Sequence, residues 1–321
     1  MMNKQTYDKS PVHMTSIGGQ AVIEGVMMRG PKETATAVRK SDGSIVIDKH
    51  PVSGFVTKYK LNKIPIVRGI FSFVDSLVTG MKCLMFSADQ MDLEEDDDSY
   101  KPSKFETWLE DKFGDKIKDI AIYFAVVVAI CFSIGLFMLL PNALASVVSI
   151  FVDNAILLNL CEGVIRMSIF LGYLLLVSRM KDIQRVFEYH GAEHKTIATY
   201  ESGAELTVEN ARKHSRLHPR CGTSFLLIVM VVSIIIFSFL RWGAMWQNML
   251  CRLALLPVVA GISYEIIKFA GKSKNKCVAF LTKPGLWLQK ITTREPDDSQ
   301  LEVAIASLKA VLTDNKEDDK W

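Results

Sequence analysis

The sequence predicts an α-helical polytopic membrane protein with four transmembrane helices and a small cytosolic N-terminal domain rich in β-structure. Long uncharged runs alternate with charged segments, although hydrophobic residues make up only 49% of the 321-residue chain. Four of these runs approach the length of about 20 residues that a helix needs to cross a bilayer core. Basic residues gather on one side of the runs, which predicts their orientation.

The first 60 residues predict a lead and a β-rich domain. Residues 1–15 are expected to be a disordered lead. They lack the apolar core of a signal peptide, so this segment is expected to stay in the cytosol. Glycines punctuate the apolar run SIGGQAVIEGVMMRGP, and residues 16–60 are expected to form the cytosolic β-rich domain. Within it, Asp42-Gly43 predicts a tight hairpin, since this pair tolerates the positive φ angles of such a turn.

Residues 61–90 predict an amphipathic helix, followed by a polar linker. Apolar residues recur there at three- and four-residue steps, namely Ile66, Ile70, Val74, Leu77, Met81 and Leu84. Arg68, Asp75 and Lys82 disfavour a membrane span, so this helix is expected to lie at the membrane interface. Residues 91–119 are an acidic linker and a basic juxtamembrane segment, with too little apolar content to fold.

Residues 120–177 are predicted to form transmembrane helices 1 and 2, and residues 222–270 to form helices 3 and 4. The apolar runs within them are 120–140, 155–177, 222–240 and 248–270. Pro141 is expected to end the first run. The second and fourth runs contain ionisable residues that should face the bundle interior, namely Glu162, Arg166, Arg252 and Glu265. Glu162 and Arg252 are predicted to pair.

The distribution of lysine and arginine predicts that both termini and the 178–221 loop are cytosolic. The basic residues of this loop are Arg179, Lys181, Arg185, Lys195, Arg212, Lys213, Arg216 and Arg220. The opposite loops carry Asp153 and Arg241 as their charged residues, and cytosolic loops of membrane proteins are the basic ones. The cytosolic tail, 271–321, also predicts a docking helix over 300–312 that Ser299 and Glu302 would cap.

The 178–221 loop is a histidine-rich helical segment with metal-ligand spacing. His190 and His194 are four residues apart, so on a helix they share a face, with Glu193 beside them. In this H-x-x-E-H pattern two histidines hold zinc and the glutamate acts on water. His214 and His218 repeat the spacing, and Cys221 follows.

A catalytic zinc site needs three protein ligands and an open position. His190 and His194 would be two of them, and Glu193 would be the catalytic base. The third ligand could be His218, Cys221, His214 or Glu265, and the spacing alone does not choose among them. The alternative is that the histidines serve structure, as helix caps and hydrogen-bonding groups.

The overall charge and the cysteine spacing exclude two other classes of protein. The net charge of +3 is too small to indicate a nucleic-acid-binding protein. The six cysteines are scattered without a C-x-x-C pair, which disfavours a disulfide framework.

The segments GGQAVIEGVMMRGP, EYHGAEHKTIATYE, HPRCGTSF and PGLWLQKITTREPDDSQLEVAI resemble the YqhQ-like family of bacterial membrane proteins, a domain of unknown function. The resemblance covers residues from about 16 to 312. It implies a bacterial polytopic membrane protein, and it is sometimes accompanied by the label of metal-dependent enzyme. That label matches His190, Glu193, His194, His218 and Cys221 in this chain.

Two functions follow from these observations. The first is an accessory factor of the cytoplasmic membrane that binds other membrane proteins at its cytosolic face, with the histidines serving structure. The second is a zinc-dependent hydrolase at the cytosolic membrane surface that uses His190, Glu193 and His194. Transport through the charged bundle has the least support, because the four runs show no internal repeat.

Overall fold

A computed structural model describes residues 12–52, 64–91, 116–239, 245–272 and 275–320. They fall into two compact units, which are described separately. Unit 1 comprises Met1–Met91, Leu174–Ile236 and Leu250–Trp321, and unit 2 comprises Asp92–Tyr173 and Phe237–Met249. Most of the predicted lead and of the 91–119 linker lies outside the described residues. Thr15, which was assigned to the lead, is buried and donates its backbone N–H to Glu201 over 2.9 Å.

Unit 1 contains the small antiparallel sheet, in the order β1-β2-β3-β4. The strands are β1 (Gly18–Val22), β2 (Gly25–Arg29), β3 (Glu33–Arg39) and β4 (Ile45–Pro51). The hairpin predicted at Asp42-Gly43 is confirmed, because β3 and β4 pair on either side of it and Gly43 has a φ of +84°. β1 is therefore an edge strand, paired along one side with β2.

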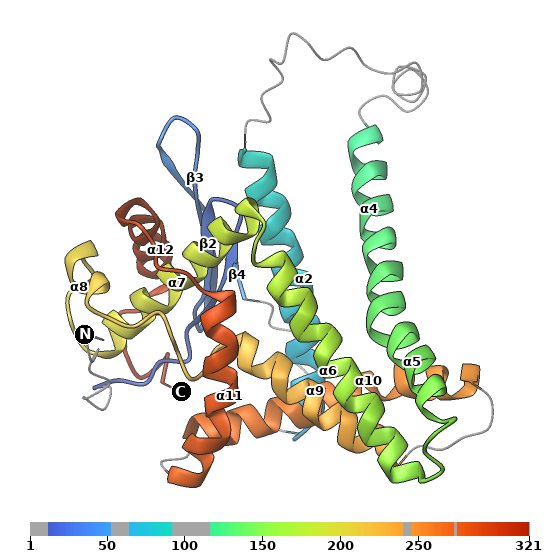
Figure 1. Cartoon of the computed structure of the whole chain (residues 1–321). Helices are drawn as coiled ribbons and strands as arrows, with labels where there is room; N and C mark the ends of the chain where they lie inside the picture. The colour runs from blue at the N-terminus through green and yellow to red at the C-terminus, as the bar shows by residue number, and fades with distance from the viewer. Residues whose placement is uncertain (1–11, 53–63, 92–115, 240–244, 273–274, 321) are drawn as a thin grey trace, which may run out of the picture. The chain divides into compact units, whose positions relative to one another are not determined.

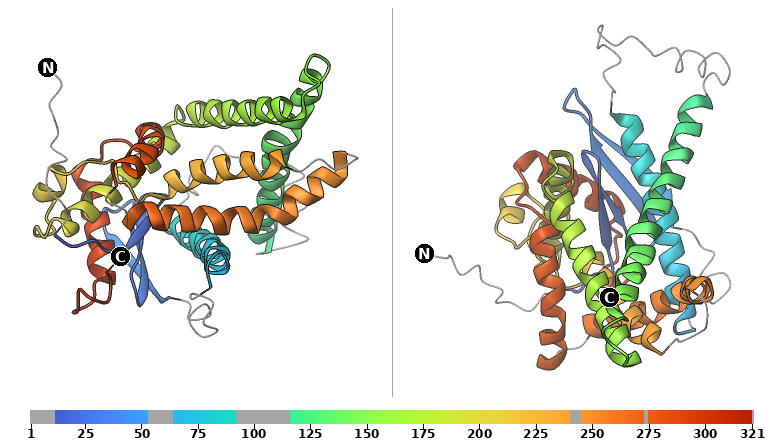
Figure 2. Two further views of the ribbon diagram at one scale, coloured as in Figure 1. Left: turned by 90° about the horizontal axis from the view of Figure 1, so that it is seen from below. Right: turned by 45° about the vertical axis from the view of Figure 1, so that its right-hand side comes forward.

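Helices cover both faces of this sheet (Figures 1 and 2). One face packs Val22, Met27 and Val38 against Cys83 of α2 (Val67–Gln90). The other face packs against α7 (Lys181–Glu201) and α12 (Asp298–Val311) in a core that includes Tyr189 and Leu301. Side chains alternate between the two faces of a strand, so each strand contributes to both cores.

The tail helix docks on the sheet, but its cap differs from the prediction. Asp297 rather than Ser299 is the N-cap, and its side chain accepts from the backbone N–H of Gln300 over 2.9 Å. The Gln300 side chain accepts in return from the backbone N–H of Asp297, which completes the capping box. In the sequence DDSQ both aspartates and the serine are residue types that favour the N-cap, and Asp297 takes this position. The preceding helix is α11 (Lys276–Thr292).

The histidine-rich segment forms α7 and the short α8 (Val208–Arg212). α7 is separate from the helix of the second apolar run. That run is α6 (Ala155–Val177), and the chain is non-helical at Met180, where ψ is +133°. Thr207 caps α8, because its hydroxyl accepts from the backbone N–H of Asn210.

Within the described residues, four helices are apolar and long enough to cross a bilayer, and they indicate that the protein associates with a membrane. Their apolar segments are Val67–Gln90, Phe124–Val148, Leu157–Val177 and Leu250–Gly271. This set differs from the predicted one. α2 is included, and α9 (Gly222–Ser238), predicted as the third span, is shorter, with 17 residues. The last segment belongs to α10 (Met245–Lys272).

In unit 2, Pro141 does not end the first apolar helix, contrary to prediction. α4 (Lys116–Ile134) passes through a π-helical stretch, η2 (Gly135–Leu139), into α5 (Leu140–Val148). Pro141 stands in the first turn of α5, where the missing N–H of proline costs least. A π-turn widens the backbone and lets the helix continue.

The buried charges of unit 2 pair within one helix. Glu162 accepts from the guanidinium of Arg166, one turn later on α6, over 2.7 Å, and both side chains are buried. The predicted pairing of Glu162 with Arg252 stays a prediction.

Candidate metal centre

α7 carries the H-x-x-E-H residues into the interior of unit 1. Its second half is almost continuously buried from Tyr189 to Thr199, which is unusual for a segment with so many polar residues. Gly191 permits this packing, because a Cβ at that position would collide with the backbone carbonyl of Arg294. This glycine weakens the helix but allows the chain between α11 and α12 to lie against it.

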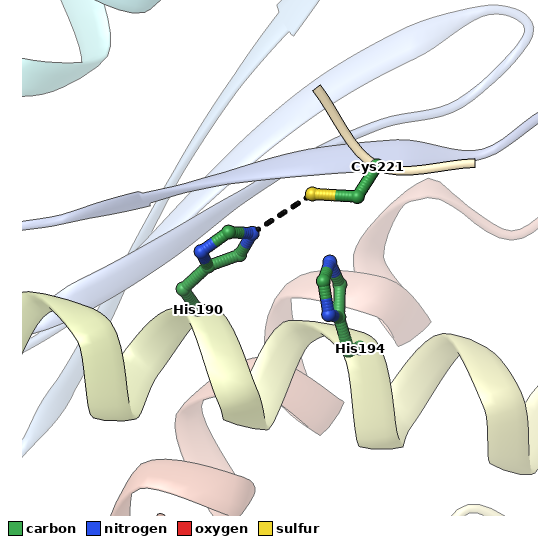
Figure 3. A group of neighbouring side chains, drawn as sticks. All are labelled: His190, His194 and Cys221. Atoms are coloured by element: carbon green, nitrogen blue, oxygen red, sulfur yellow. Dashed lines mark hydrogen bonds between the residues drawn. The ribbon is translucent and has the colours of Figure 1, made fainter. Parts of the chain in front are cut away.

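His190, His194 and Cys221 come together in a group whose candidate ligand atoms all lie within 4.8 Å of one another (Figure 3). The two histidine rings project from successive turns of α7, and their centroids are 4.5 Å apart. Cys221 lies immediately before α9, and its Sγ is 3.1 Å from the Nε2 of His190. These separations are close to those of ligands on one zinc ion, whose bonds are about 2.0 to 2.3 Å long. We refer to these three residues as the ligand group.

A backbone carbonyl lies at the Nδ1 atom of each histidine ring and fixes the orientation of the ring. The Nδ1 of His190 is 2.8 Å from the carbonyl oxygen of Thr292, and the Nδ1 of His194 is 2.6 Å from that of Arg216. An Nδ1–H that donates to a carbonyl leaves Nε2 as the lone-pair nitrogen of a neutral imidazole. Metal-binding histidines are usually oriented in this way.

The electrostatics of the ligand group favour a thiolate. Burial opposes ionisation of Cys221, but His194 and His190 outweigh it and hold the pKa of the thiol well below its usual value. Burial likewise opposes a charge on His190, yet the neighbouring thiolate raises the pKa of this ring to about 9. At neutral pH the ligand group therefore pairs a thiolate with a protonated His190 ring, and a metal ion that bound there would displace the Nε2 proton of this ring. Thiolate is the form of cysteine that binds metals.

Glu193 lies beside the ligand group and against the edge strand of the sheet. Its side chain is buried, and its carboxylate accepts a hydrogen bond from the backbone N–H of Gly19. A Cβ on Gly19 would come within 2.9 Å of the Glu193 Cγ and 2.6 Å of the Met27 carbonyl oxygen, so only glycine fits there. Burial raises the pKa of Glu193, while His194 and His190 oppose the rise.

A cavity of about 330 Å³ opens next to this site. Glu193, His194 and Cys221 contribute to its lining, as do Ser76 and Thr79 of α2. The residues from Ser16 to Gln20 form a continuous part of its wall. All of these residues belong to unit 1. The candidate base and two candidate ligands therefore face a space that a small molecule or a short chain segment could enter.

The structure does not bring the other predicted ligands into the ligand group. His218 lies 5.7 Å from His194 between ring centroids, but its Nε2 is 3.4 Å from the Glu201 carboxylate. His214 lies near the Ser202 hydroxyl, at 3.3 Å. Glu265 of α10 accepts from the Nε of Arg68 on α2 over 2.7 Å.

Sequence reasoning missed the groups that position the site. Glu201 accepts from the backbone of Thr15 and from the side chain of Arg220, and the ring of His218 completes this buried set. We refer to Glu201, Thr15, His218 and Arg220 as the Glu201 cluster. The carbonyls of Thr292 and Arg216 left no signal in the sequence, because every residue has a carbonyl. The paired glycines at 18 and 19 did leave a signal, although it did not indicate a contact with Glu193.

Comparison with known proteins agrees with the resemblance noted above. Residues 64–314 match a family described as "Protein of unknown function (DUF1385)". The chain is also 38% identical over 301 residues to the "Uncharacterized protein YqhQ" of Bacillus subtilis (strain 168). The aligned region covers 92% of each of the two chains. This chain belongs to the DUF1385 family. No solved structure matches it.

Proposed function

We propose that this protein is a zinc-dependent hydrolase in which His190, His194 and Cys221 hold the metal and Glu193 is the catalytic base. One observation carries the proposal. Both histidines are held through Nδ1 by backbone carbonyls, so that their Nε2 atoms remain available beside the Cys221 thiolate. Three protein ligands next to a cavity are the pattern of catalytic zinc sites rather than of four-ligand structural ones.

The residues have complementary roles in this mechanism. When bound, zinc supplies Lewis acidity and makes water acidic near neutral pH. Glu193 takes the proton of the attacking water and returns it to the leaving group. Its raised pKa suits both steps, because a group with a pKa closer to the working pH accepts and releases a proton readily. The Gly19 N–H holds the carboxylate in place.

The accessory-factor hypothesis assigned the histidines a structural role. Two features favour the hydrolase instead. A purely structural cluster would not need a thiolate with a lowered pKa, nor a cavity lined by its acidic neighbour Glu193.

We also propose that the site lies on the cytosolic side of the membrane, as the distribution of basic residues predicts. In this topology α2 lies at the interface rather than across the bilayer. α2 packs on the sheet, where Asp75 pairs with Arg29 and the Ser87 hydroxyl donates to the Ile23 carbonyl. Its exposed face is apolar, at Val74, Leu77, Val78, Met81, Leu84 and Met85.

Metal analysis of the purified full-length protein tests the centre. Wild type should carry about one zinc ion per chain, and Cys221→Ala should lose it. Cys83→Ala is the matched control, because Cys83 is a buried cysteine of α2 that packs on the other face of the sheet. Equal zinc in wild type and Cys221→Ala would refute the centre.

Catalysis is tested separately with Glu193→Gln, which should keep the metal. We expect it to lose about 10²- to 10⁴-fold of zinc-dependent hydrolysis of an activated ester such as p-nitrophenyl acetate, the usual contribution of a general base. Full activity of the metal-loaded variant would rule out Glu193 as the base.

The position of α2 is tested by attaching an environment-sensitive fluorophore at Leu77 or Met85 in proteoliposomes with quenchers at known depths. An interfacial helix places both labels at the same shallow depth. A spanning helix separates them by about 12 Å along the helix axis. A label on Ile47, which is exposed on β4, should remain in water and serves as the control.

A further inference from the structure

The end of α11 supports both histidines of the ligand group. The carbonyl oxygen of Thr292 lies 2.8 Å from the Nδ1 of His190. The carbonyl of Thr293 accepts a hydrogen bond from the guanidinium of Arg216, whose own carbonyl lies at the Nδ1 of His194. This end of α11 therefore orients one ring directly and the other through a single intervening residue.

Gln289, which lies one turn before Thr293, contacts the segment that carries the third residue of the ligand group. Its side chain is fully buried. Its Oε1 accepts from the backbone N–H of His218 over 2.8 Å, and its Nε2 donates to the carbonyl oxygen of the same residue over 2.7 Å. Nε2 also donates to the Ser224 hydroxyl over 3.3 Å. The amide of Gln289 therefore uses its oxygen and both of its N–H donors on this one segment.

The two residues that Gln289 holds lie on either side of Cys221. His218 precedes it by three residues, and Ser224 follows it by three. The backbone N–H of Ser224 also donates to the Cys221 carbonyl over 3.1 Å. Because a short segment held at both ends has little freedom, the place of the Cys221 Sγ, 3.1 Å from the Nε2 of His190, depends on where Gln289 holds the segment.

α11 and the start of α9 are closely packed around these hydrogen bonds. Gly285 lies one turn before Gln289, and a Cβ at that position would come within 2.5 Å of the Ser224 hydroxyl oxygen and 2.9 Å of the Ser224 Cβ. A side chain there would push the two helices apart. The bonds of Gln289 therefore lie inside a close helix contact, where a polar atom that loses its partner is costly.

We infer that Gln289 is a positioning residue, whose side chain sets the place of the Cys221 Sγ relative to His190 and His194. It acts through the backbone of the cysteine segment and not as a ligand. The inference rests on the proposed hydrolase function, since it concerns the geometry of the same metal centre. Loss of an outer residue that orients a ligand typically costs about 10- to 100-fold in metal affinity.

The test compares Gln289→Met with wild type as full-length protein in detergent, loaded with Co(II) as a spectroscopic substitute for zinc. Methionine has a similar length but no N–H donor and only a weak acceptor, so the change removes the three hydrogen bonds with little change in volume. Wild type should show a thiolate-to-cobalt absorption band that Cys221→Ala lacks. Gln289→Met should bind Co(II) about 10- to 100-fold more weakly, with a weaker thiolate band at saturating Co(II).

Gln300→Met is the matched control, because Gln300 is also a fully buried glutamine of unit 1. Its side chain bonds to the Asp297 N–H and to the Glu188 carboxylate, away from the cysteine segment. This variant should have a lowered melting temperature, as Gln289→Met should, but the Co(II) affinity and thiolate band of wild type. Equal spectral changes in both variants would overturn the inference.

Gln289→Glu is the second variant, in case Gln289→Met does not fold. It has the same shape as glutamine and keeps the acceptor for the His218 N–H, but it loses the Nε2 donor bonds to the His218 carbonyl and the Ser224 hydroxyl. It should also weaken the thiolate band, and a band equal to that of wild type would overturn the inference.

Hydrogen exchange of the metal-free proteins separates the inference from the proposed function. The backbone amides of Arg220 and Ser224 should exchange about tenfold faster in Gln289→Met than in Gln300→Met, the effect of losing one or two buried hydrogen bonds. Faster exchange, in a protein whose wild type binds no Co(II), would support the positioning role and overturn the hydrolase. Unchanged exchange and an unchanged thiolate band in Gln289→Met would overturn the inference and leave the hydrolase intact.

Discussion

The ligand group and the Glu201 cluster are neighbouring polar sites built from the same two segments. They differ in the ring nitrogens that their histidines leave available to a metal ion. Both combine residues of α7 with residues of the 214–221 segment, and both are largely buried. In the ligand group, carbonyls take the Nδ1 atoms of His190 and His194 and leave Nε2 facing a thiolate. In the Glu201 cluster, the ring of His218 pairs with a carboxylate that also neutralises Arg220.

The comparison shows that spacing alone does not decide which histidine can bind a metal. His190/His194 and His214/His218 have the same four-residue spacing. The difference is the number of ring nitrogens in use. His218 uses both, because Nε2 contacts the Glu201 carboxylate and Nδ1 accepts from the backbone N–H of Arg220, each over 3.4 Å. The charged side chains of the Glu201 cluster can be buried without a metal ion because they are paired with one another.

The largest expected difference is in metal affinity. His194→Ala removes one of three ligands, and zinc in small protein sites contributes about 10 to 16 kcal/mol. We therefore expect a loss of affinity of more than about 10³-fold, measured by competition with a chromophoric chelator. His218→Ala should bind zinc with the stoichiometry of wild type. Loss of zinc in His218→Ala alone would reverse the assignment of the two sites.

Removing the carboxylate of the Glu201 cluster should reduce stability rather than metal binding. Glu201→Ala removes the carboxylate that pairs with the buried Arg220 side chain, and breaking a buried pair in this way costs about 3 to 5 kcal/mol. Thermal unfolding in detergent should show the loss, and zinc content should stay near one per folded chain. An unchanged melting temperature would mean that the cluster is not structural.

The acid sensitivity of the same cluster gives a smaller effect. Burial opposes ionisation of Glu201, but the bond with His218, the charge of Arg220 and the Thr15 N–H outweigh it and lower its pKa below 4.5. A carboxylate of this kind contributes stability that is present above its unfolded pKa and is lost as the pH falls through the folded one. The free energy of unfolding should therefore fall more steeply below pH 4.5 in wild type than in Glu201→Gln. Parallel curves for the two proteins would contradict the assignment.

The smallest effect is expected at His214. Its contact with Ser202 is 3.3 Å long and exposed. His214→Ala should change the free energy of unfolding by no more than about 0.5 kcal/mol, and its zinc content should equal that of wild type. A loss of metal in this variant would show that the ligand group is incomplete without His214.

Much of the local structure could be predicted from the sequence, because it depends on neighbouring residues. The Asp42-Gly43 turn, the Thr207 cap and the apolar helices 155–177 and 248–270 follow from propensities and periodicity within a few residues. The shared face of His190 and His194 follows from helix geometry in the same way.

The tertiary structure decided everything that depends on distant segments. It brought Cys221 to His190 across 31 residues, placed Glu193 against Gly19, and separated Glu265 from the ligand group by pairing it with Arg68. It also decided that Pro141 is accommodated by a π-helical turn. Periodicity and spacing describe which residues share a face, whereas a metal centre depends on which faces meet, and that is determined by packing over the whole chain.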